Sequence, residues 1–367
     1  MIYLDSGATS LSKPAIVKDA VICALENCGN PGRGGYSASM TAAKTVLRCR
    51  EQAAAFFDCD PEQVVMTHNC THGLNIAIRT LVKPGDRVVI SGFEHNAVTR
   101  PLYGMGAQIM VAGQKLFDWQ DTLERFEEAL KDGASAAVFT HVSNVFGYIL
   151  PVEEMAKLCR QYGVPFIVDA AQSAGILPVS LKKWGADFIA MPGHKGLLGP
   201  QGTGLLLCGR KPEPLLRGGT GSFSASWDMP DFLPDMLEAG TLNVPGIAGL
   251  RAGLSYLHKR GICNIRAAEE KQAKRCIKAL QELGLRVFSG LHQSGTVSFV
   301  PDMDCEEAAD VLAQQGIAVR AGLHCAPLAH KSAGTLHTGT VRISFGYDAS
   351  ADQTGAFLLA AKRLVKR

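Results

Sequence analysis

Short apolar runs alternate with amphipathic stretches between about residue 64 and residue 210. The runs lie at residues 63–66, 87–90, 136–139, 165–168, 188–190 and 204–207. They are largely apolar throughout rather than alternating, which predicts strands that are covered on both faces of a sheet. Stretches between them, such as residues 152–162 before Gly163, have a helical pattern that ends at a glycine. The alternation predicts an α/β fold with a mainly parallel sheet.

The pattern changes after residue 245. A long helical stretch is followed by shorter apolar runs at residues 295–300 and 340–345, with further helical segments around them. We therefore expect a large domain over residues 16–245 and a smaller α+β domain over residues 246–367. The first residues, 1–15, are expected to pack beside the smaller domain.

Polar side chains follow most of the predicted strands. Parallel sheets collect their ligands at the carboxyl ends of the strands, so these side chains are expected to share one edge. They are Thr67, His68, Asn69, Glu94, His95, Asn144, Asp169, His194 and Lys195.

Two of these positions, together with Gln172 nearby, have the chemistry that pyridoxal 5'-phosphate (PLP) requires. Lys195, in a glycine-rich turn, offers an amine to the aldehyde of the cofactor, and Asp169 offers a carboxylate to its ring nitrogen. Gln172 lies one turn later and can bond the phenolate oxygen. Plainer interpretations remain, because most lysines are solvated and aspartate is a favoured helix N-cap.

The segment around Thr71 follows a strand and opens a helix, which predicts a phosphate site made of backbone amides and the Thr71 hydroxyl. A metal site at His68 and His72 is the alternative, but the segment lacks the glutamate of the zincin motif and no third ligand is evident. We expect no metal. The glycines of residues 199–204 do not follow the order of a nucleotide-binding loop. His95 can stack on a cofactor ring or simply end a strand, and Asn144 is equally ambiguous by itself.

Cys325 differs from the other ten cysteines because His324 and Arg320 are close in sequence and Gly322 and Pro327 mark a loop. Cationic neighbours lower the pKa of a thiol and favour the nucleophilic thiolate. No second cysteine follows in C-x-x-C spacing, which argues against a redox disulfide. An inert buried thiol is the competing interpretation.

Composition narrows the class of protein further. The chain has 367 residues, of which 47% are hydrophobic and 19% are charged, and its formal net charge is +3. Near-balanced charge gives no reason to expect nucleic acid or a membrane surface as partner, and no apolar run is long enough to span a bilayer. The start of the chain does not resemble a signal peptide, so we expect a cytoplasmic protein with reduced thiols.

These segments together resemble the class V aminotransferase-like PLP enzymes of fold type I, and within them the cysteine desulfurases and selenocysteine lyases. Gly193-His194-Lys195 resembles the PLP lysine segment, and Asp169-Ala-Ala-Gln172 the segment that binds the cofactor ring. Arg320-x-Gly-x-His-Cys325 resembles the second desulfurase group, whose nucleophile lies on a short loop. The resemblance implies a mainly parallel seven-stranded sheet in the large domain.

The resemblance also implies roles for individual residues. Lys195, Cys325 and His95 would be catalytic. The cofactor would be held by Thr71, His95, Asn144, Asp169, Gln172, His194, Lys195 and Thr241, and the substrate by Asn144, Arg320, Arg342 and Arg33. Thr241 and Arg33 would reach the site of a neighbouring subunit, which implies a homodimer. Pro192, Tyr36 and Ala321 depart from the residues that are usual in the family at these places.

The implied reaction removes sulfur from L-cysteine, giving L-alanine and a persulfide on Cys325 that passes to an acceptor protein. L-Selenocysteine is the closest alternative substrate. Another PLP reaction (aminotransferase, cystine lyase or sulfinate desulfinase) and a non-catalytic binding protein also stay open. The pathway of the acceptor is open too, and iron–sulfur cluster assembly is one of the choices.

Overall fold

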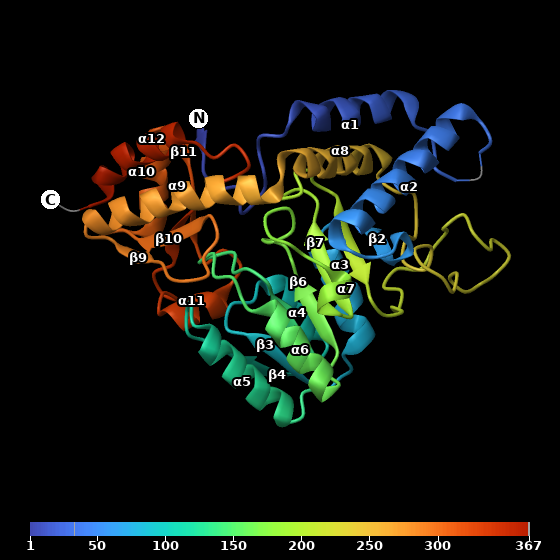
Figure 1. Cartoon of the computed structure of the whole chain (residues 1–367), viewed down its shortest axis with the longest axis horizontal. Helices are drawn as coiled ribbons and strands as arrows, with labels where there is room; N and C mark the ends of the chain where they lie inside the picture. Colours follow the sequence, from blue (N-terminus) through green and yellow to red (C-terminus); the bar gives the residue numbers. More distant parts are fainter. Residues whose placement is uncertain (33, 366–367) are drawn as a thin grey trace.

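A seven-stranded sheet forms the centre of the computed structural model, which describes residues 1–32 and 34–365 (Figure 1). The strand order is β2-β8-β7-β6-β5-β3-β4, and only β8 runs antiparallel to its neighbours. The strands are β2 (Val64–Thr67), β3 (Arg87–Ser91), β4 (Gln108–Ala112), β5 (Ala136–Thr140), β6 (Phe166–Asp169), β7 (Phe188–Pro192) and β8 (Gly204–Cys208). The α/β fold with a mainly parallel sheet is therefore confirmed.

All six predicted runs form strands, and the structure adds β4 at one edge of the sheet. An edge strand has a partner on one side only, and three of the five residues of β4 are exposed. Its pattern therefore differs from that of the buried central strands.

Helices cover both faces of the sheet. Side chains of α3 (Cys70–Leu81) and α4 (Asn96–Gly104) form one buried cluster with strand residues such as Val65 and Ile167. Alternate strand residues such as Val64 and Val168 point to the other cluster. That cluster contains residues of α2 (Ser37–Phe57), α5 (Trp119–Lys131), α6 (Val152–Tyr162), α7 (Leu181–Trp184) and α8 (Val244–Arg260). Burial on both faces explains why the central strands are continuously apolar.

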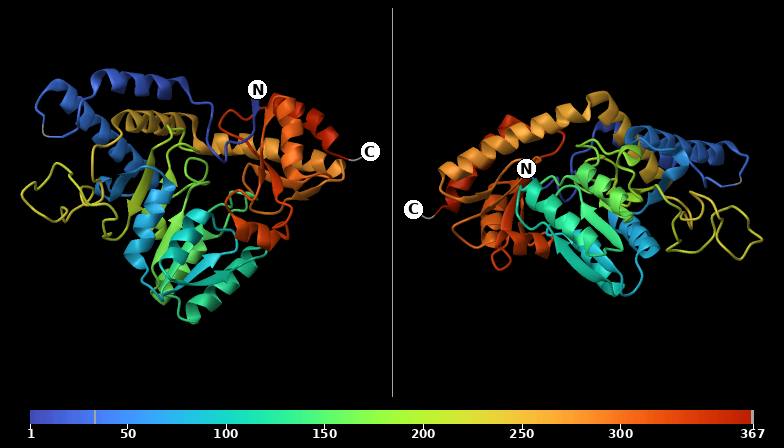
Figure 2. Two further views of the ribbon diagram at one scale, coloured as in Figure 1. Left: turned by 180° about the vertical axis from the view of Figure 1, so that it is seen from behind. Right: turned by 60° about the horizontal axis from the view of Figure 1, so that its bottom comes forward.

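The C-terminal part has a core of its own around an antiparallel sheet of order β12-β13-β10-β9. The strands are β9 (Arg286–Phe288), β10 (Thr296–Val300), β12 (Arg320–Gly322) and β13 (Thr340–Ser344). The helices are α9 (Ile262–Glu282), α10 (Cys305–Gln314), α11 (Pro327–Ala333) and α12 (Ala351–Ala361). Short 3-10 helices lie at η1 (Pro61–Gln63) and η2 (Lys362–Leu364). Figure 2 shows this part beside the sheet, with both chain termini on it.

The first residues of the chain join the C-terminal part. β1 (Ile2–Tyr3) pairs in parallel with β11 (Ile317–Ala318), and Leu4 is buried in the C-terminal core. Helix α1 (Ala15–Asn27) then packs on α8 (Figure 1). The division into domains at residue 245 stays a prediction. Among the described residues, no helix combines the length and apolarity that crossing a bilayer demands.

Helix α8 lies directly on the turn that follows β7. Within this turn Leu198 N–H donates to Lys195 O at 2.9 Å and Gly199 N–H donates to Gly193 O at 2.7 Å. Gly253 of α8 has no side chain, and a Cβ there would overlap the carbonyl oxygen of Leu197. The helix therefore depends on this glycine for its close approach to the turn that carries Lys195.

We expect Gly253→Ala to lower the free energy of unfolding by about 1–3 kcal/mol, because the added methyl group has to push α8 away from the turn. Urea denaturation measures the change. Gly355→Ala in α12 is the matched control: no atom lies within 4 Å of the added Cβ, and alanine is the better helix former by about 1 kcal/mol. Equal effects of the two substitutions would contradict the proposed close contact.

Candidate active site

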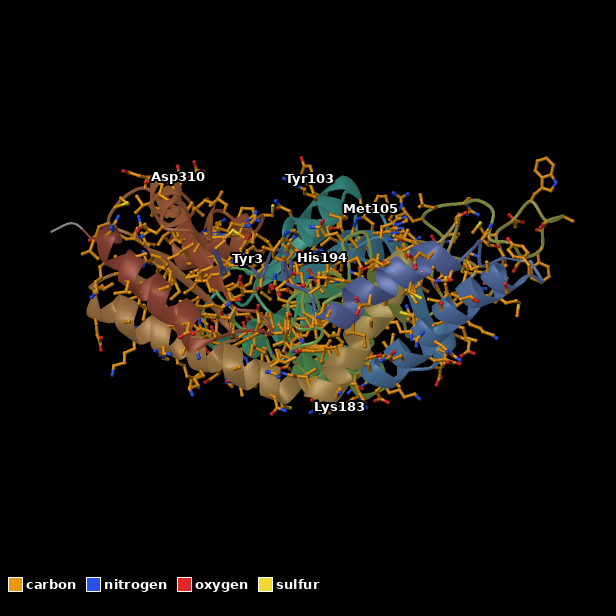
Figure 3. The ribbon with its side chains drawn as sticks, turned by 90° about the horizontal axis from the view of Figure 1, so that it is seen from above. Tyr3, Tyr103, Met105, Lys183, His194 and Asp310 are labelled. Atoms are coloured by element: carbon orange, nitrogen blue, oxygen red, sulfur yellow. The ribbon has the colours of Figure 1, made fainter. Side chains whose placement is uncertain are left out.

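A cavity of about 230 Å³ lies at the carboxyl ends of the parallel strands. Segments that follow β2, β3, β5, β6 and β7 supply its walls. Seven of the predicted cofactor-binding residues line it: Thr71, His95, Asn144, Asp169, Gln172, His194 and Lys195. Figure 3 shows His194 near the middle of the molecule, between the sheet and the C-terminal part. The structure thus brings together residues that are up to 124 positions apart.

The backbone of His194 and Lys195 is held by the N-terminal segment. Ser10 N–H donates to His194 O at 3.0 Å, and the Ser10 hydroxyl donates to Lys195 O at 3.2 Å. Lys13 Nζ also donates to His194 O, at 3.2 Å. Burial lowers the pKa of the Lys195 amine, and the charge of Asp169 opposes this shift. Lys195 is therefore a fixed amine that gives up its proton more readily than a solvated lysine.

Asp169 presents one oxygen of its buried carboxylate to the cavity. Oδ1 accepts from Ala171 N–H at 2.8 Å and from the Cys70 thiol at 3.3 Å. Burial, followed by the charge of Asp169, raises the pKa of Cys70 well above its usual value, so the thiol keeps its proton and donates it. Oδ2 has no hydrogen bond to the described residues. It suits a protonated ring nitrogen, as PLP would present.

His95 is the N-cap of α4, and its Nδ1 accepts from Ala97 N–H at 3.0 Å. Burial lowers the pKa of this imidazole, so the neutral ring has its proton on Nε2. The preceding Glu94 is fully buried and accepts from Ser91 Oγ at 2.5 Å and from Thr140 N–H at 2.9 Å. Glu94 therefore ties the turn before His95 to the end of β5. Gln172 donates one amide proton to Gly7 O at 2.9 Å and keeps a second for a ligand.

The start of α3, where the sequence predicts a phosphate site, forms another part of the cavity wall. Thr71 lies in the first turn of α3, which Asn69 caps by accepting from His72 N–H at 2.9 Å. Pro192 lines the cavity and provides no hydroxyl. Burial lowers the pKa of His194 to about 4, and its Nδ1 lies 3.0 Å from Thr9 Oγ1. His194 is therefore a neutral neighbour of the site.

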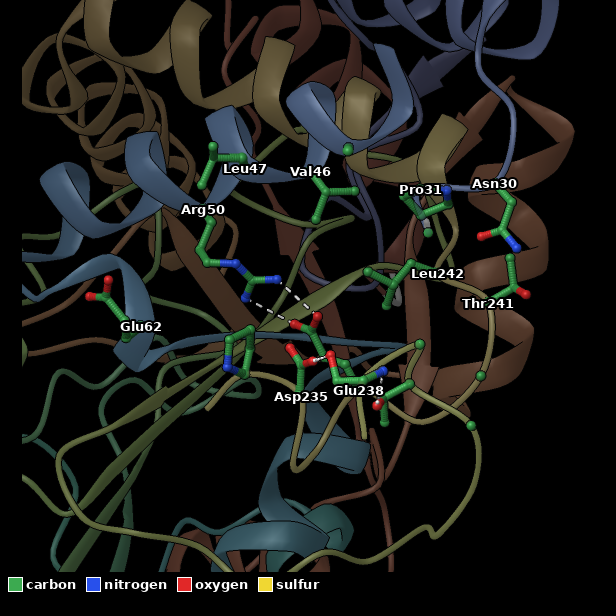
Figure 4. Close-up of a pocket in the computed structure, with 18 of the residues that line it drawn as sticks. Asn30, Pro31, Val46, Leu47, Arg50, Glu62, Asp235, Glu238, Thr241 and Leu242 are labelled. Atoms are coloured by element: carbon green, nitrogen blue, oxygen red, sulfur yellow. Dashed lines mark hydrogen bonds and ion pairs between the residues drawn. The ribbon is translucent and has the colours of Figure 1, made fainter. Parts of the chain in front are cut away.

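Thr241 does not line this cavity. It is exposed at the rim of a second cavity of about 820 Å³, beside the ion pair of Arg50 and Glu238 (Figure 4). Glu238 also accepts from Met66 N–H at 2.7 Å, so the pair fixes the turn that leads to Thr241. Tyr36 is exposed at the start of α2. Arg33 lies outside the described residues.

Arg342 is buried behind Asn144 and bonded to a carboxylate that the sequence analysis did not select. Its Nη1 donates to Asn144 O at 2.9 Å and its Nη2 to Asp5 Oδ1 at 2.6 Å. Arg320 donates to the other oxygen of Asp5, from Nη2 at 2.8 Å and from Nε at 3.0 Å. Two atoms here, Arg342 Nε and Asn144 Oδ1, are buried without a partner among the described residues. Unpaired buried donors and acceptors are costly, which points to a ligand with its own acceptor and donor.

Cys325 is exposed on a loop that is bonded to the wall of the cavity. Asn144 Nδ2 donates to His324 O at 2.8 Å, and Asn96 N–H donates to Cys325 O at 2.7 Å. His324 and Cys325 have φ angles of 52° and 54°, a left-handed conformation that non-glycine residues rarely adopt. Backbone strain of this kind concentrates at functional sites.

His324 does not provide the positive charge that its position beside Cys325 suggested. Its ring is buried, and burial followed by the charge of Arg342 lowers its pKa to about 3. Arg320 remains as a cation whose charge interacts with Cys325. The expectation of a cationic histidine beside the thiol is therefore wrong, because the side chain of His324 turns inward from the loop.

The inward side chain of His324 belongs to a chain of hydrogen bonds in which the donor and the acceptor of each bond can be assigned. His324 Nε2 lies 3.2 Å from Arg320 O, which can only accept, so Nε2 has the proton. Nδ1 then accepts from His330 Nε2 at 3.5 Å, and His330 Nδ1 accepts from the Thr335 hydroxyl at 2.8 Å. Burial also lowers the pKa of His330 to about 4. Two neutral histidines therefore brace the loop of Cys325 from behind.

The aminotransferase class-V family model matches residues 2–357. The chain belongs to the aminotransferase class-V family. A probable cysteine desulfurase of Methanothermobacter thermautotrophicus is 33% identical over 94% of this chain and 90% of its own length. One of Pyrococcus abyssi is also 33% identical, over 100% of this chain and 94% of its own length.

One solved structure is similar to nearly the whole of this chain. The apo structure of a cysteine desulfurase from Thermococcus onnurineus has a TM-score of 0.91 and 34% identity, covering 99% of this chain and 94% of its own. The predicted fold, fold type I with a mainly parallel seven-stranded sheet, is therefore confirmed.

Four residues that contact the site were not predicted from the sequence. Cys70, Asn96, His330 and Asp5 all contact predicted site residues. Cys70 and Asn96 stand next to selected positions, so a wider window around each strand end would have included them. Nothing local marks Asp5 or His330, because their partners come from distant segments.

We expect His330→Leu to lower the free energy of unfolding by about 1–3 kcal/mol, because it leaves the buried Nδ1 of His324 without a donor. Iodoacetamide should also alkylate Cys325 at a changed rate once its loop is no longer braced. His330→Gln is the matched variant, since its amide keeps a donor toward His324. Urea denaturation and alkylation kinetics compare the two. If both variants behave alike, the hydrogen-bond chain does not hold the loop.

Proposed function

We propose that this class-V protein is a PLP-dependent cysteine desulfurase, a sulfurtransferase that converts L-cysteine to L-alanine and leaves a persulfide on Cys325. The observation that carries the proposal is the joint placement of two reactive groups. Lys195 lines the cavity, while the exposed Cys325 lies on a loop bonded to the cavity wall through Asn144. The names of the relatives support the same activity.

The residues of the cavity fit PLP. Lys195 would bond its aldehyde, Asp169 Oδ2 its ring nitrogen and the second amide proton of Gln172 its phenolate oxygen. His95 would stack on the ring, with Thr71 and the first turn of α3 at the phosphate. When bound, PLP supplies an electron sink that stabilises negative charge at the α-carbon of an amino acid.

The binding and proton steps follow from the arginine and lysine side chains. Arg342 has an unpaired Nε–H beside Nη2, which keeps a second proton, and the two nitrogens would form a bidentate donor for the substrate α-carboxylate. Lys195 Nζ, whose pKa is lowered by burial, accepts the proton from the substrate α-carbon. His95 Nε2 has the proton that faces the cavity and is the donor in reach of the substrate.

The sulfur step belongs to Cys325. Its thiolate attacks the substrate sulfur, a new S–S bond forms, and the C–S bond of the substrate breaks with its electron pair kept on carbon. Protonation of that carbon, and return of the proton from Lys195 to the α-carbon, give alanine, and the persulfide stays on Cys325. Since Cys325 is exposed, an acceptor protein can reach the persulfide from solvent.

The position of Thr241 supports the proposal of a homodimer. It is exposed, and it is separated from the cavity of its own chain, so it suits the phosphate of a neighbouring subunit. Phe223 and Trp227 nearby in the sequence are also exposed, and a second copy of the chain would cover such apolar side chains. The buried ion pair of Arg50 and Glu238 would hold this region in place.

Cys325→Ala should lower alanine and sulfide release from L-cysteine by roughly a thousandfold or more, because the nucleophile is gone. Bound PLP should remain, since Cys325 does not line the cavity. Alanine is quantified on purified, PLP-loaded protein with reductant present, and the persulfide is located by mass spectrometry. Cys263→Ala, at another exposed thiol, is the control.

The same assay separates the alternative activities. Alanine from L-selenocysteine alone would make the protein a selenocysteine lyase. Full turnover of L-cysteine by Cys325→Ala would refute the persulfide route and favour another PLP reaction.

Mixed dimers test the role of Thr241. Lys195→Ala and Thr241→Ala proteins should each have low activity as homodimers. Heterodimers are obtained by refolding a mixture of the two proteins. Each heterodimer should have about half of the activity of a wild-type dimer, because one of its two sites then has both residues intact. A single chain that supplied Thr241 to its own site would show no recovery. Light scattering gives the oligomeric state in parallel.

A further inference from the structure

We propose that Asp5 decides which amino acids this site accepts. By bonding both arginines, Asp5 holds Arg342 in place for the α-carboxylate and neutralises Arg320, so the site favours a neutral side chain such as a thiol over an anionic one. The inference rests on the proposed function, since it concerns the substrate of the same site.

Asp5 is a buried carboxylate shared by two guanidinium groups. Asp5 is only 6% exposed. Its Oδ1 accepts a hydrogen bond from Arg342, and its Oδ2 accepts one from Arg320. The three groups together have one net positive charge, which the α-carboxylate of one amino acid neutralises. A substrate with a second anion would leave that anion uncompensated beside them.

The two bonds on Arg342 determine which of its edges is free. Asn144 O and Asp5 Oδ1 each occupy one proton, on Nη1 and on Nη2. Nε–H, which shares an edge of the guanidinium with Nη2, is buried without a partner in the described chain, and Nη2 keeps a second proton. Because a guanidinium is planar and rigid, fixing two of its protons also fixes the direction of this edge.

Arg320 lies beside the loop of Cys325, since its carbonyl oxygen is 3.2 Å from His324 Nε2. Its charge interacts with Cys325, and the substrate sulfur has to meet the Sγ of that residue. About half of the Arg320 side chain is exposed, so without Asp5 it would be a free cation at the mouth of the site. A sulfinate or sulfonate side chain would then be attracted. Asp5 removes this attraction because it occupies two donors of Arg320.

The position of Asp5 is fixed by its neighbours in the chain. Gly7 N–H donates to Ser344 Oγ at 2.7 Å, and Gln172 donates to Gly7 O at 2.9 Å. Leu4 N–H donates to Ala318 O at 2.9 Å on the other side. Asp5 is thus attached both to the cavity wall and to the sheet that presents Arg320 and Arg342, and it stays beside the arginines when a substrate enters.

Binding of two unreactive probes to the PLP-loaded enzyme tests the inference. L-Serine has a neutral side chain and L-cysteate an anionic one, and the change in cofactor absorbance gives each Kd. We expect Asp5→Asn to weaken L-serine binding and to shift the Kd ratio toward L-cysteate by roughly tenfold, the effect of one charged hydrogen bond. Asp310→Asn makes the same change at an exposed position of α10 (Figure 3) and should leave the ratio unaltered.

A charge-restoring variant separates this role from a structural one. Asp5→Asn combined with Arg320→Gln again leaves one net positive charge, and its ratio should return toward the wild-type value. Arg320→Gln alone should shift the ratio away from L-cysteate, which also tests the inference if Asp5→Asn does not fold. An unchanged ratio in Asp5→Asn, or no return in the double variant, overturns it. The ratio needs no turnover, whereas failure of the wild type to form alanine would count against the proposed function.

Discussion

The candidate site depends on the contacts of residues 5–13, a segment without a helix or strand of appreciable length. On one side Ser10 and Lys13 hold the backbone of His194 and Lys195, and on the other side Asp5 holds Arg342. The segment therefore links the turn after β7 to the C-terminal sheet. Neither part contains the whole site, since the amine and the carboxylate of Asp169 come from the large sheet and the arginines from the small one. The hydrogen bonds of this segment add to the apolar contacts that hold the two parts together, such as those of Ala326 and Ala329 in the core of the large sheet.

A second constraint acts on the nucleophile. The loop of Cys325 has a left-handed backbone at two successive residues, and a conformation of this kind costs of order 1–3 kcal/mol per residue unless its surroundings hold it. Asn144 and Asn96 bond its carbonyl groups, and His324 with His330 braces it from the inside. Asn144 thus contacts three parts of the site: the cavity, the loop of Cys325 and Arg342. Its amide Oδ1 is still free for a ligand.

The sequence predicted the parts of the site that follow from sheet topology. Lys195, Asp169 and His95 each stand at a strand end, and parallel strands bring such ends to one edge whatever the details of the fold. The bond between Asp5 and Arg342 could not be predicted in this way, because it joins residues 337 positions apart, which an isolated bridge between Asp5 and Ser344 of β13 brings together. The charge of His324 was also inaccessible. Its proximity to Cys325 in sequence suggested a cation, whereas a reversal of the backbone buries the ring and leaves it neutral.

The same arrangement separates the two halves of the proposed reaction in space. Groups that act on carbon, Lys195 and Asp169, line a cavity where burial lowers the pKa of the amine. Cys325, which takes the sulfur, lies outside that cavity and is exposed. The sulfur that Cys325 takes can therefore be passed on at the surface of the protein. For this to work the loop has to stay in contact with the wall of the cavity, since a nucleophile displaced by about 1 Å loses much of its rate. The bracing by two neutral histidines and two asparagines meets that requirement without placing another charge beside the thiol.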